Sequence, residues 1–355
     1  MAWFNRKPSS ALGIDISTSA VKLLELKKQG ASYRVESYAA VPLPDDAVVD
    51  HQIKDIELVG TAIADAIQKS RTKTKHAAVA LGGAQVISKV ISMPVGLSED
   101  ELEQQIDIEA EHYIPFPLEE VNLDFTVLGP VDGDDTQVEV LLVACRTEQV
   151  DQRVAVLEHA NAIPSVVDVE PYVLENAAQL LTDQMPNNGQ DTTVALFDIG
   201  AMSTSATILH NLVSVYSRVQ MFGGRQLTDE IMERYELSFA EAGLAKKTGE
   251  GLPEGYEQEI LQPFIADLVQ VVNRVLQLFY SSTPRYGKVE KILLAGGVST
   301  MPGVAEMIQA HLDVPCEVAK PFAGMEVSTH SNPKALERDM PALMIAAGLA
   351  MRGIQ

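Results

Sequence analysis

Residues 12–22 read LGIDISTSAVK, an apolar strand that ends at Asp15 and turns through small and hydroxyl residues. Residues 195–204, ALFDIGAMST, repeat this pattern around Asp198. A carboxylate at a strand end, beside free backbone N–H groups, can hold a metal–phosphate from one side. Two such turns on separate halves of a chain can hold it from both sides. One such turn alone is more often a structural feature, but the internal repeat favours a phosphate site.

A third strand ends in a pair of glycines. Residues 292–299 read ILLAGGVS, and the missing Cβ atoms of Gly296 and Gly297 would let a flat ring or a phosphate approach the backbone. The sequence contains no GxxxxGK[ST] run, which excludes a P-loop. No GxGxxG follows a strand, which argues against a dinucleotide-binding fold.

Length and composition indicate an ordinary globular protein of more than one domain. The chain has 355 residues, 46% of them apolar and 21% charged. Cys145 and Cys316 are far apart and form no CxxC pair, which argues against a disulfide framework or a zinc site and for a reducing compartment. Residues 1–8 lack the apolar core of a signal peptide, and no run reaches the roughly 18 apolar residues of a membrane span. We therefore expect a cytoplasmic protein that reaches a membrane only through partners.

The charge is strongly negative and unevenly spread. A formal charge of −22 argues against nucleic acid as a ligand, because phosphate backbones bind to basic faces. No Lys or Arg stands between Lys89 and Arg146, while Asp and Glu recur throughout that segment. The segment is either a solvated acidic face or a docking surface for a partner that carries Arg or Lys.

Hydrophobic periodicity places an α+β unit between the two Asp turns. Strands are predicted at 12–16, 21–27, 33–41 and 76–81, with a helix over 56–69. The acidic unit then begins with a strand over 86–92 and a helix that starts at residue 98. Two strands, over 122–128 and 138–144, and a helix over 148–161 complete it. Ser98 and Glu101 form a capping box at the start of its first helix. Further elements are expected at 166–170, 172–181, 204–209, 213–218, 225–235, 240–247, 258–281, 291–295, 303–312 and 340–352, together with a strand that leads into the Asp198 turn after a linker over 185–193.

Taken in order, these motifs resemble those of the actin-like ATPase superfamily. Residues 13–22 and 197–204 are similar to its two phosphate loops, and 292–304 to its adenosine motif. Residues 169–181 and 340–353 resemble the two connecting helices of that superfamily. Residues 223–228 resemble the turn that enters its outer domain. The resemblance covers almost the whole chain and implies an α/β fold of two RNase H-like lobes around a nucleotide cleft.

The acidic unit narrows the resemblance to the FtsA branch, which carries a subdomain called 1C. Within it, residues 12–26, 113–128 and 141–171 resemble the PilM family, the cytoplasmic actin-like components of the type IV pilus inner-membrane platform. FtsA would add a C-terminal amphipathic membrane helix, for which residues 350–355 leave no room. The implied division is 1–75, 166–190 and 340–355 for subdomain 1A, 76–165 for 1C, 191–224 and 288–339 for 2A, and 225–287 for 2B.

The resemblance implies ATP or ADP with Mg²⁺ as cofactors. Asp15 and Asp198 would face the metal through water. The nucleotide would be held by both turns, the outer-domain helix and the adenosine motif, with contacts from Asp15, Ser17, Thr18, Ser19, Lys22, Asp198, Gly200, Ser203, Thr204, Lys246, Gly296, Gly297 and Met301. Glu170 matches an acid that aligns the attacking water in bacterial actin homologues. The alternative interpretation of Glu170 is a solvent-facing carboxylate before a proline.

One position departs from the pattern. Relatives show Ala-Glu-x-x-Lys where a helix touches the ribose, whereas residues 242–246 here read AGLAK. Lys246 therefore matches and Gly243 replaces the glutamate, which puts the ribose contacts in question. Hydrolysis is less firmly implied than binding, so at most a weak ATPase is expected.

The resemblance also implies partners. The short cytoplasmic N-terminal peptide of the membrane protein PilN would bind between subdomains 1A and 1C, within residues 76–165. This would link the PilN–PilO–PilP complex to the motor and platform proteins of the pilus. Two alternatives remain open: an FtsA-like filament former that associates with itself, and a small-molecule kinase. A kinase would need an additional general base in the cleft, and no loop supplies an obvious one.

Overall fold

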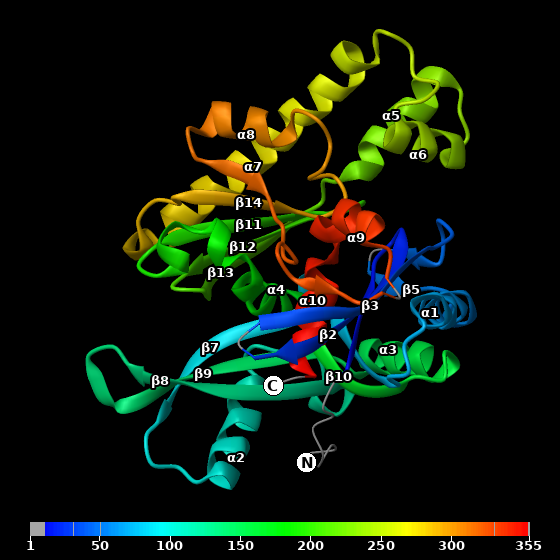
Figure 1. Cartoon of the computed structure of the whole chain (residues 1–355). Helices are drawn as coiled ribbons and strands as arrows, with labels where there is room; N and C mark the ends of the chain where they lie inside the picture. The colour runs from blue at the N-terminus through cyan, green and yellow to red at the C-terminus, as the bar shows by residue number, and fades with distance from the viewer. Residues whose placement is uncertain (1–10, 31, 50, 330, 354–355) are drawn as a thin grey trace.

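The structure is a computed structural model that describes residues 11–30, 32–49, 51–329 and 331–353 (Figure 1). The expectation about a signal peptide rests on residues 1–8, which lie outside this description, as do residues 354–355 at the C-terminal end. Two large sheets are stacked with helices between them, and a smaller sheet extends to one side of the first (Figure 1).

The first lobe is built on a six-stranded mixed sheet. In spatial order its strands are β10 (Ile163–Val169), β6 (His76–Leu81), β1 (Leu12–Ile16), β2 (Ala20–Gln29), β3 (Ser32–Pro42) and β16 (Glu326–Val327). β1 pairs antiparallel with β2 and parallel with β6. Helices α1 (Ile56–Ser70) and α3 (Thr147–His159) cover one face, where Ile63 and Leu157 are fully buried with Leu12. A short hairpin, β4 (Val48–Val49) and β5 (Gln52–Ile53), follows β3.

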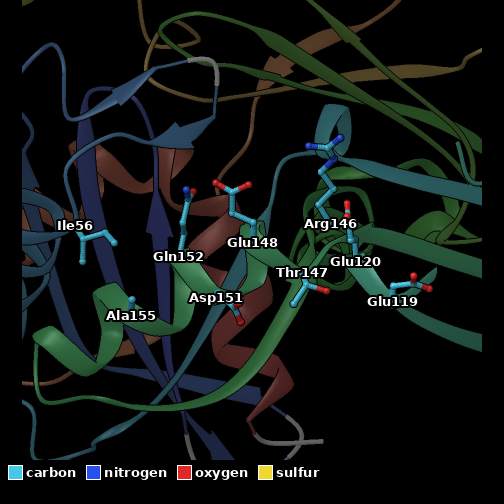
Figure 2. A pocket seen from close by; sticks show the side chains of 9 residues that line it. All are labelled: Ile56, Glu119, Glu120, Arg146, Thr147, Glu148, Asp151, Gln152 and Ala155. Carbon is cyan, nitrogen blue, oxygen red and sulfur yellow. The ribbon is translucent and has the colours of Figure 1, made fainter. Parts of the chain in front are cut away.

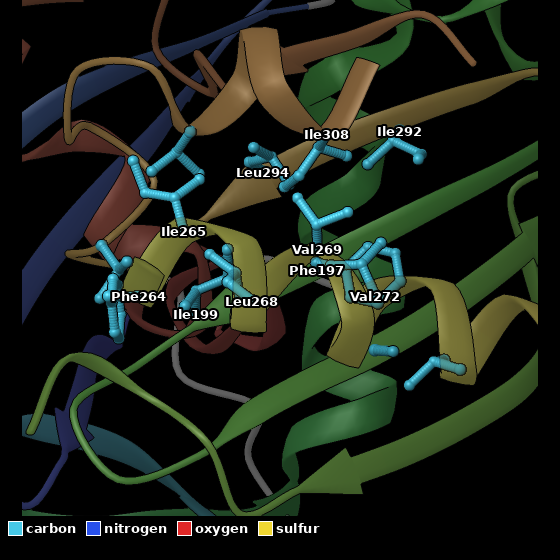
Figure 3. Packing of buried hydrophobic residues seen from close by; sticks show 14 of the residues in the cluster. Phe197, Ile199, Phe264, Ile265, Leu268, Val269, Val272, Ile292, Leu294 and Ile308 are labelled. Atoms are coloured by element: carbon cyan, nitrogen blue, oxygen red, sulfur yellow. The ribbon is translucent and has the colours of Figure 1, made fainter. Parts of the chain in front are cut away.

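The second lobe repeats the plan with a five-stranded sheet. Its order is β13 (Val213–Gln220), β12 (Thr204–His210), β11 (Thr193–Ile199), β14 (Lys291–Ala295) and β15 (Cys316–Val318). The long helix α7 (Gln262–Ser282) packs Leu268 and Val272 against Phe197 of the sheet (Figure 3). Burial of each such side chain contributes about 1.5–3 kcal/mol. This half also contains α5 (Gly224–Tyr235), α6 (Phe239–Thr248) and α8 (Val304–Leu312). Helix α9 (Pro333–Asp339) instead buries Leu336 with Leu24 and Val35 of the first sheet.

Two helices separate the sheets. Helices α4 (Glu170–Ala178) and α10 (Met344–Arg352) share a buried cluster with residues of both lobes. Their close approach requires glycine: a Cβ on Gly348 would lie 2.0 Å from the Val173 carbonyl oxygen, and one on Gly13 would lie 1.9 Å from that of Ala346. β1 therefore packs directly on α10, which fixes the position of the Asp15 turn at its end.

A three-stranded sheet forms a separate unit, which we call the insertion (residues 86–146). Its strand order is β7 (Val86–Pro94), β9 (Asp134–Arg146), β8 (Val121–Val131), with α2 (Glu99–Ala110) on one face. The expected capping box is present, since the Ser98 amide donates to Glu101 at 2.9 Å and the Glu101 amide to the Ser98 hydroxyl at 3.3 Å. Ile106 of α2 and Val140 of β9 are fully buried in its own core.

Two elements within the range predicted for subdomain 1C pack in the first lobe. β6, at residues 76–81, lies between β1 and β10 in the first sheet instead of in the unit predicted for residues 76–165. Helix α3 likewise buries Val156 and Leu157 in the core of the first lobe. The order of elements cannot reveal this, because a parallel strand pairs with partners far away in sequence. No helix within the described ranges is long and apolar enough to cross a membrane.

Candidate functional site

The first Asp turn is a tight hairpin between β1 and β2. Asp15 and Lys22 are directly opposite in the register, and the Lys22 ammonium lies 2.8 Å from the Asp15 carboxylate. Ser17 holds the turn, since its hydroxyl donates to the Ala20 carbonyl at 2.8 Å. Ser19 at the tip is exposed and Thr18 is partly exposed. The turn therefore presents hydroxyl side chains beside a buried ion pair.

The second Asp turn meets the glycine pair at the carboxyl ends of two strands. β11 and β14 are parallel neighbours and Asp198 is opposite Ala295, so Asp198 lies beside Gly296. Gly296 has a φ of +84°, and a Cβ there would lie 2.5 Å from Asp198 Oδ1. Such a φ strongly disfavours side chains. The Gly200 amide donates to the Ser203 carbonyl at 2.9 Å and closes the turn.

Three carboxylates and one ammonium interact across the cleft. Burial raises the pKa of Glu170 to about 8, with further contributions from Asp15 and Asp198, while Arg153 and Lys22 oppose the rise. Burial also raises the pKa of Asp198 to about 6, opposed by Lys22 and reinforced by Asp15. Burial would lower the pKa of Lys22, but its carboxylate neighbours outweigh this and raise it. The raised pKa values of Glu170 and Asp198 mean that their ionised forms are disfavoured here, and a bound cation would favour those forms.

Arg153 and His51 also lie in this region, and the sequence patterns do not predict either of them as a site residue. Arg153 of α3 is 2% exposed; its Nε donates to the Ala80 carbonyl at 3.2 Å and its Nη2 to the His51 carbonyl at 3.0 Å. Its Nη1 is buried without a hydrogen-bond partner in the described parts of the chain. The sequence does contain a signal that Arg153 lies on the buried face of its helix, because it stands three and four residues before the core positions Val156 and Leu157. His51 gave no comparable signal.

Three predicted nucleotide contacts have structural roles. Thr204 is fully buried and its hydroxyl donates to the Phe222 carbonyl at 2.7 Å, so it is not presented to the cleft. Lys246 donates to the Gly224 carbonyl at 2.7 Å and to the Thr228 hydroxyl at 2.5 Å, and burial lowers its pKa to about 8. Met301 packs against the core of the second lobe. The resemblance to the second phosphate loop implies the contact from Thr204, and a sequence pattern carries no information on how deeply its hydroxyl lies.

The described part of the chain contains no set of side chains that could ligate a metal ion directly. Among its residues, no group of three or more His, Cys, Asp or Glu side chains is arranged to hold such an ion. The sequence prediction had Asp15 and Asp198 reach Mg²⁺ through water, and it remains a prediction. The clustered carboxyls around Glu170, whose ionised forms a cation would favour, are the feature that fits such an ion.

A second candidate site is a groove along α3, where the first lobe meets the insertion. Its volume is about 660 Å³, and it is lined by Ile56, Glu119, Glu120, Arg146, Thr147, Glu148, Asp151, Gln152 and Ala155. Glu148 and Gln152 leave α3 on the same side, and Arg146 stands at the insertion side (Figure 2).

Arg146 also lines a second, smaller cavity. Its guanidinium stacks 4.1 Å from the centre of the Phe116 ring. The smaller cavity has a volume of about 280 Å³, and Ile87, Ile114 and Phe116 contribute to its lining. A groove lined by several carboxylates and a cavity whose described lining includes no Asp or Glu therefore share Arg146.

Comparisons with known proteins agree with this architecture. A family model described as "Type IV pilus assembly protein PilM" matches residues 13–354. A chain in a structure described as "PilM-PilN type IV pilus biogenesis complex" is 28% identical, with a TM-score of 0.83 over 98% of this chain and 99% of that chain. The ethanolamine utilization protein EutJ from Carboxydothermus hydrogenoformans is 14% identical, with a TM-score of 0.55 over 98% and 92% of the two chains, a likeness of fold alone. MreB5 of Spiroplasma citri, in a structure bound to ADP, is 12% identical, with a TM-score of 0.48 over 96% and 95%.

Proposed function

This chain belongs to the PilM family of type IV pilus assembly proteins and has the actin-like ATPase fold, and from that premise we propose that it is an ATP-binding adaptor that docks the N-terminal tail of PilN. The observation that carries the proposal is the acidic groove between the first lobe and the insertion.

The groove suits a basic, partly apolar peptide. Four carboxylates line it, from Glu119, Glu120, Glu148 and Asp151, and apolar side chains such as Phe116 line part of the adjoining cavity. Complementary charge raises association rates and excludes partners of the wrong sign. A peptide that places an Arg or Lys against these carboxylates and an apolar side chain near Phe116 would use both recesses.

The nucleotide is proposed to bind between the Asp turns. Asp15 and Asp198 would face Mg²⁺ through water, while Ser17, Thr18, Ser19 and Lys22 would hold phosphate oxygens and Gly296 would leave room for the adenosine. The clustered carboxyls support this, because a bound cation would favour their ionised forms. Glu170 would align water only when ionised, and its raised pKa leaves it mostly protonated near neutral pH before a cation binds. Slow hydrolysis at most is consistent with that property.

The biological role follows from the two sites together. Docking on PilN would keep the protein at the inner face of the inner membrane and connect the PilN–PilO–PilP complex with the pilus motor. The lobes would form the nucleotide-binding part, and the insertion, residues 86–146, would provide one wall of the docking groove.

Charge reversal in the groove tests the proposal. A fluorescent peptide of the PilN N-terminal cytoplasmic segment is titrated with the wild type and with a Glu148→Lys/Asp151→Lys double variant. We expect the variant to bind the peptide at least tenfold more weakly and with a smaller salt dependence. The reason is that two groove carboxylates are replaced by ammonium groups of the same charge as the basic peptide. Glu158→Lys is the matched control, since Glu158 is exposed on the same helix outside the groove lining. Equal affinity of all three proteins would reject the groove as the docking site.

A further inference from the structure

His51 stands at a strained position between the two candidate sites. It lies in the turn of the β4–β5 hairpin with a φ of +62°, in the left-handed region that few non-glycine residues adopt. Such a conformation persists only where surrounding contacts hold it, and it is concentrated at functional sites. The contacts of His51 extend to both sites.

The backbone carbonyl of His51 is held by residues of the groove region. It accepts hydrogen bonds from Arg153 Nη2 at 3.0 Å and from Gln85 Nε2 at 3.1 Å. Arg153 is on α3, whose neighbouring residues Asp151 and Gln152 line the groove. Gln85 lines the smaller cavity, and its Oε1 accepts from the Gly82 amide at 3.3 Å. A displacement of this carbonyl would therefore act on both walls of the docking region.

The ring of His51 reaches the other lobe. Its Nε2 lies 3.5 Å from the Ser203 hydroxyl, in the second Asp turn. On its own side the ring lies so close to Gly82 that a Cβ there would be 2.9 Å from Nδ1. The ring is thus in contact with the first lobe and the phosphate turn of the second, at the place where the lobes meet. A second contact between the lobes joins Arg225 at the start of α5 to Asp45.

We propose that His51 is a positioning residue that couples nucleotide occupancy of the cleft to the shape of the docking groove. This rests on the proposed function, in which phosphate binds at the Ser203 turn and a peptide binds along α3. A nucleotide that moves Ser203 displaces the imidazole, and the His51 carbonyl transmits the displacement to Arg153 and Gln85. The coupling is reciprocal, so the peptide changes nucleotide affinity by the same factor.

The test measures coupling, which a merely structural role would not change selectively. The Kd of a fluorescent peptide of the PilN N-terminal segment is measured without nucleotide and with saturating MgATP. We expect the ratio of these two Kd values, the larger divided by the smaller, to lie between about 5 and 150 for the wild type. His51→Asn keeps a residue that tolerates the left-handed conformation but is too short to contact Ser203. Its ratio should fall to within twofold of one, while MgATP still binds.

A matched control and a second variant make the outcome decisive. Arg71→Asn makes the same type of change at another left-handed residue, with φ +55°, exposed at the end of α1, and should keep the wild-type ratio. Arg153→Lys keeps the charge but cannot donate to both the His51 and Ala80 carbonyls. Its ratio of Kd values should therefore also fall to within twofold of one. This variant provides the test of coupling if His51→Asn fails to fold.

Each contrary outcome has a separate meaning. A wild-type ratio retained in His51→Asn, or in a folded Arg153→Lys, would overturn the coupling role. A wild-type ratio of one, with MgATP and peptide both bound, would overturn the coupling and leave the proposed function intact. Failure of the wild type to bind MgATP or the peptide would reject the proposed function, and the coupling with it.

Discussion

Replacing Glu170 by Gln is expected to stabilise the nucleotide-free protein increasingly as the pH rises. The pKa of this carboxyl increases from 4.5 to about 8 in the folded protein, first because of burial and then because of Asp15 and Asp198. Since folding disfavours the ionised form, the unfolded state loses its proton first, and wild-type stability falls as the pH rises from about 4.5 through 8. The neutral amide of the Glu170→Gln variant does not titrate, so it brings no such loss.

The size of the effect follows from the two pKa values. A difference of about 3.5 corresponds to about 5 kcal/mol above pH 8, at 1.36 kcal/mol per pKa unit. At pH 5 the corresponding loss is below about 1 kcal/mol, because the carboxyl is then largely protonated in the folded protein and partly so in the unfolded chain. Glu170 keeps partial exposure, and solvent screening reduces the cost. We therefore expect the stability difference between variant and wild type to grow by about 2 kcal/mol from pH 5 to pH 9.

Urea unfolding followed by circular dichroism, in EDTA without nucleotide, measures this difference at each pH. Glu101→Gln is the control: Glu101 is exposed, and its hydrogen bonds with Ser98 lower its pKa, so it is ionised throughout the range. Gln can also serve in a capping box, so the control difference should not change with pH. A Glu170→Gln difference that is the same at pH 5 and pH 9 would refute the assignment of a buried, charge-repelled carboxyl.

Two further predictions concern the cleft and its support. Asp198→Asn should weaken MgATP binding at least tenfold in calorimetric titration, because it removes the carboxylate that we propose faces Mg²⁺. Asp313→Asn at the end of α8 should leave the affinity unchanged, and equal losses in the two variants would contradict the proposed site. Gly13→Ala should lower the free energy of unfolding by about 3 kcal/mol, since its Cβ would lie 1.9 Å from the Ala346 carbonyl oxygen. Gly243→Ala, in an exposed helix with nothing within 4 Å, should instead raise it by about 0.5–1 kcal/mol; similar effects of the two alanines in thermal melts would disprove the packing argument.

Local patterns predicted most elements because each depends on nearby residues. The strand–turn–strand around Asp15, the capping box at Ser98 and the long helix α7 all follow from short-range periodicity or side-chain chemistry, and all are present. The short strands β15 and β16 were not predicted, because two or three residues carry no periodic signal. The family predicted from the ordered motifs is confirmed by the match over residues 13–354.

The sequence by itself determined the family, the two Asp turns and the acidic composition of the segment between them, since these depend on residue types and their order. Only the tertiary structure decided that β6 and α3 belong to the first lobe, that Thr204 is buried, and that His51 lies between the turns and the groove. The physical reason is distance along the chain. His51 and Ser203 are 152 residues apart, and no local pattern encodes a contact that forms only when two lobes pack around shared helices.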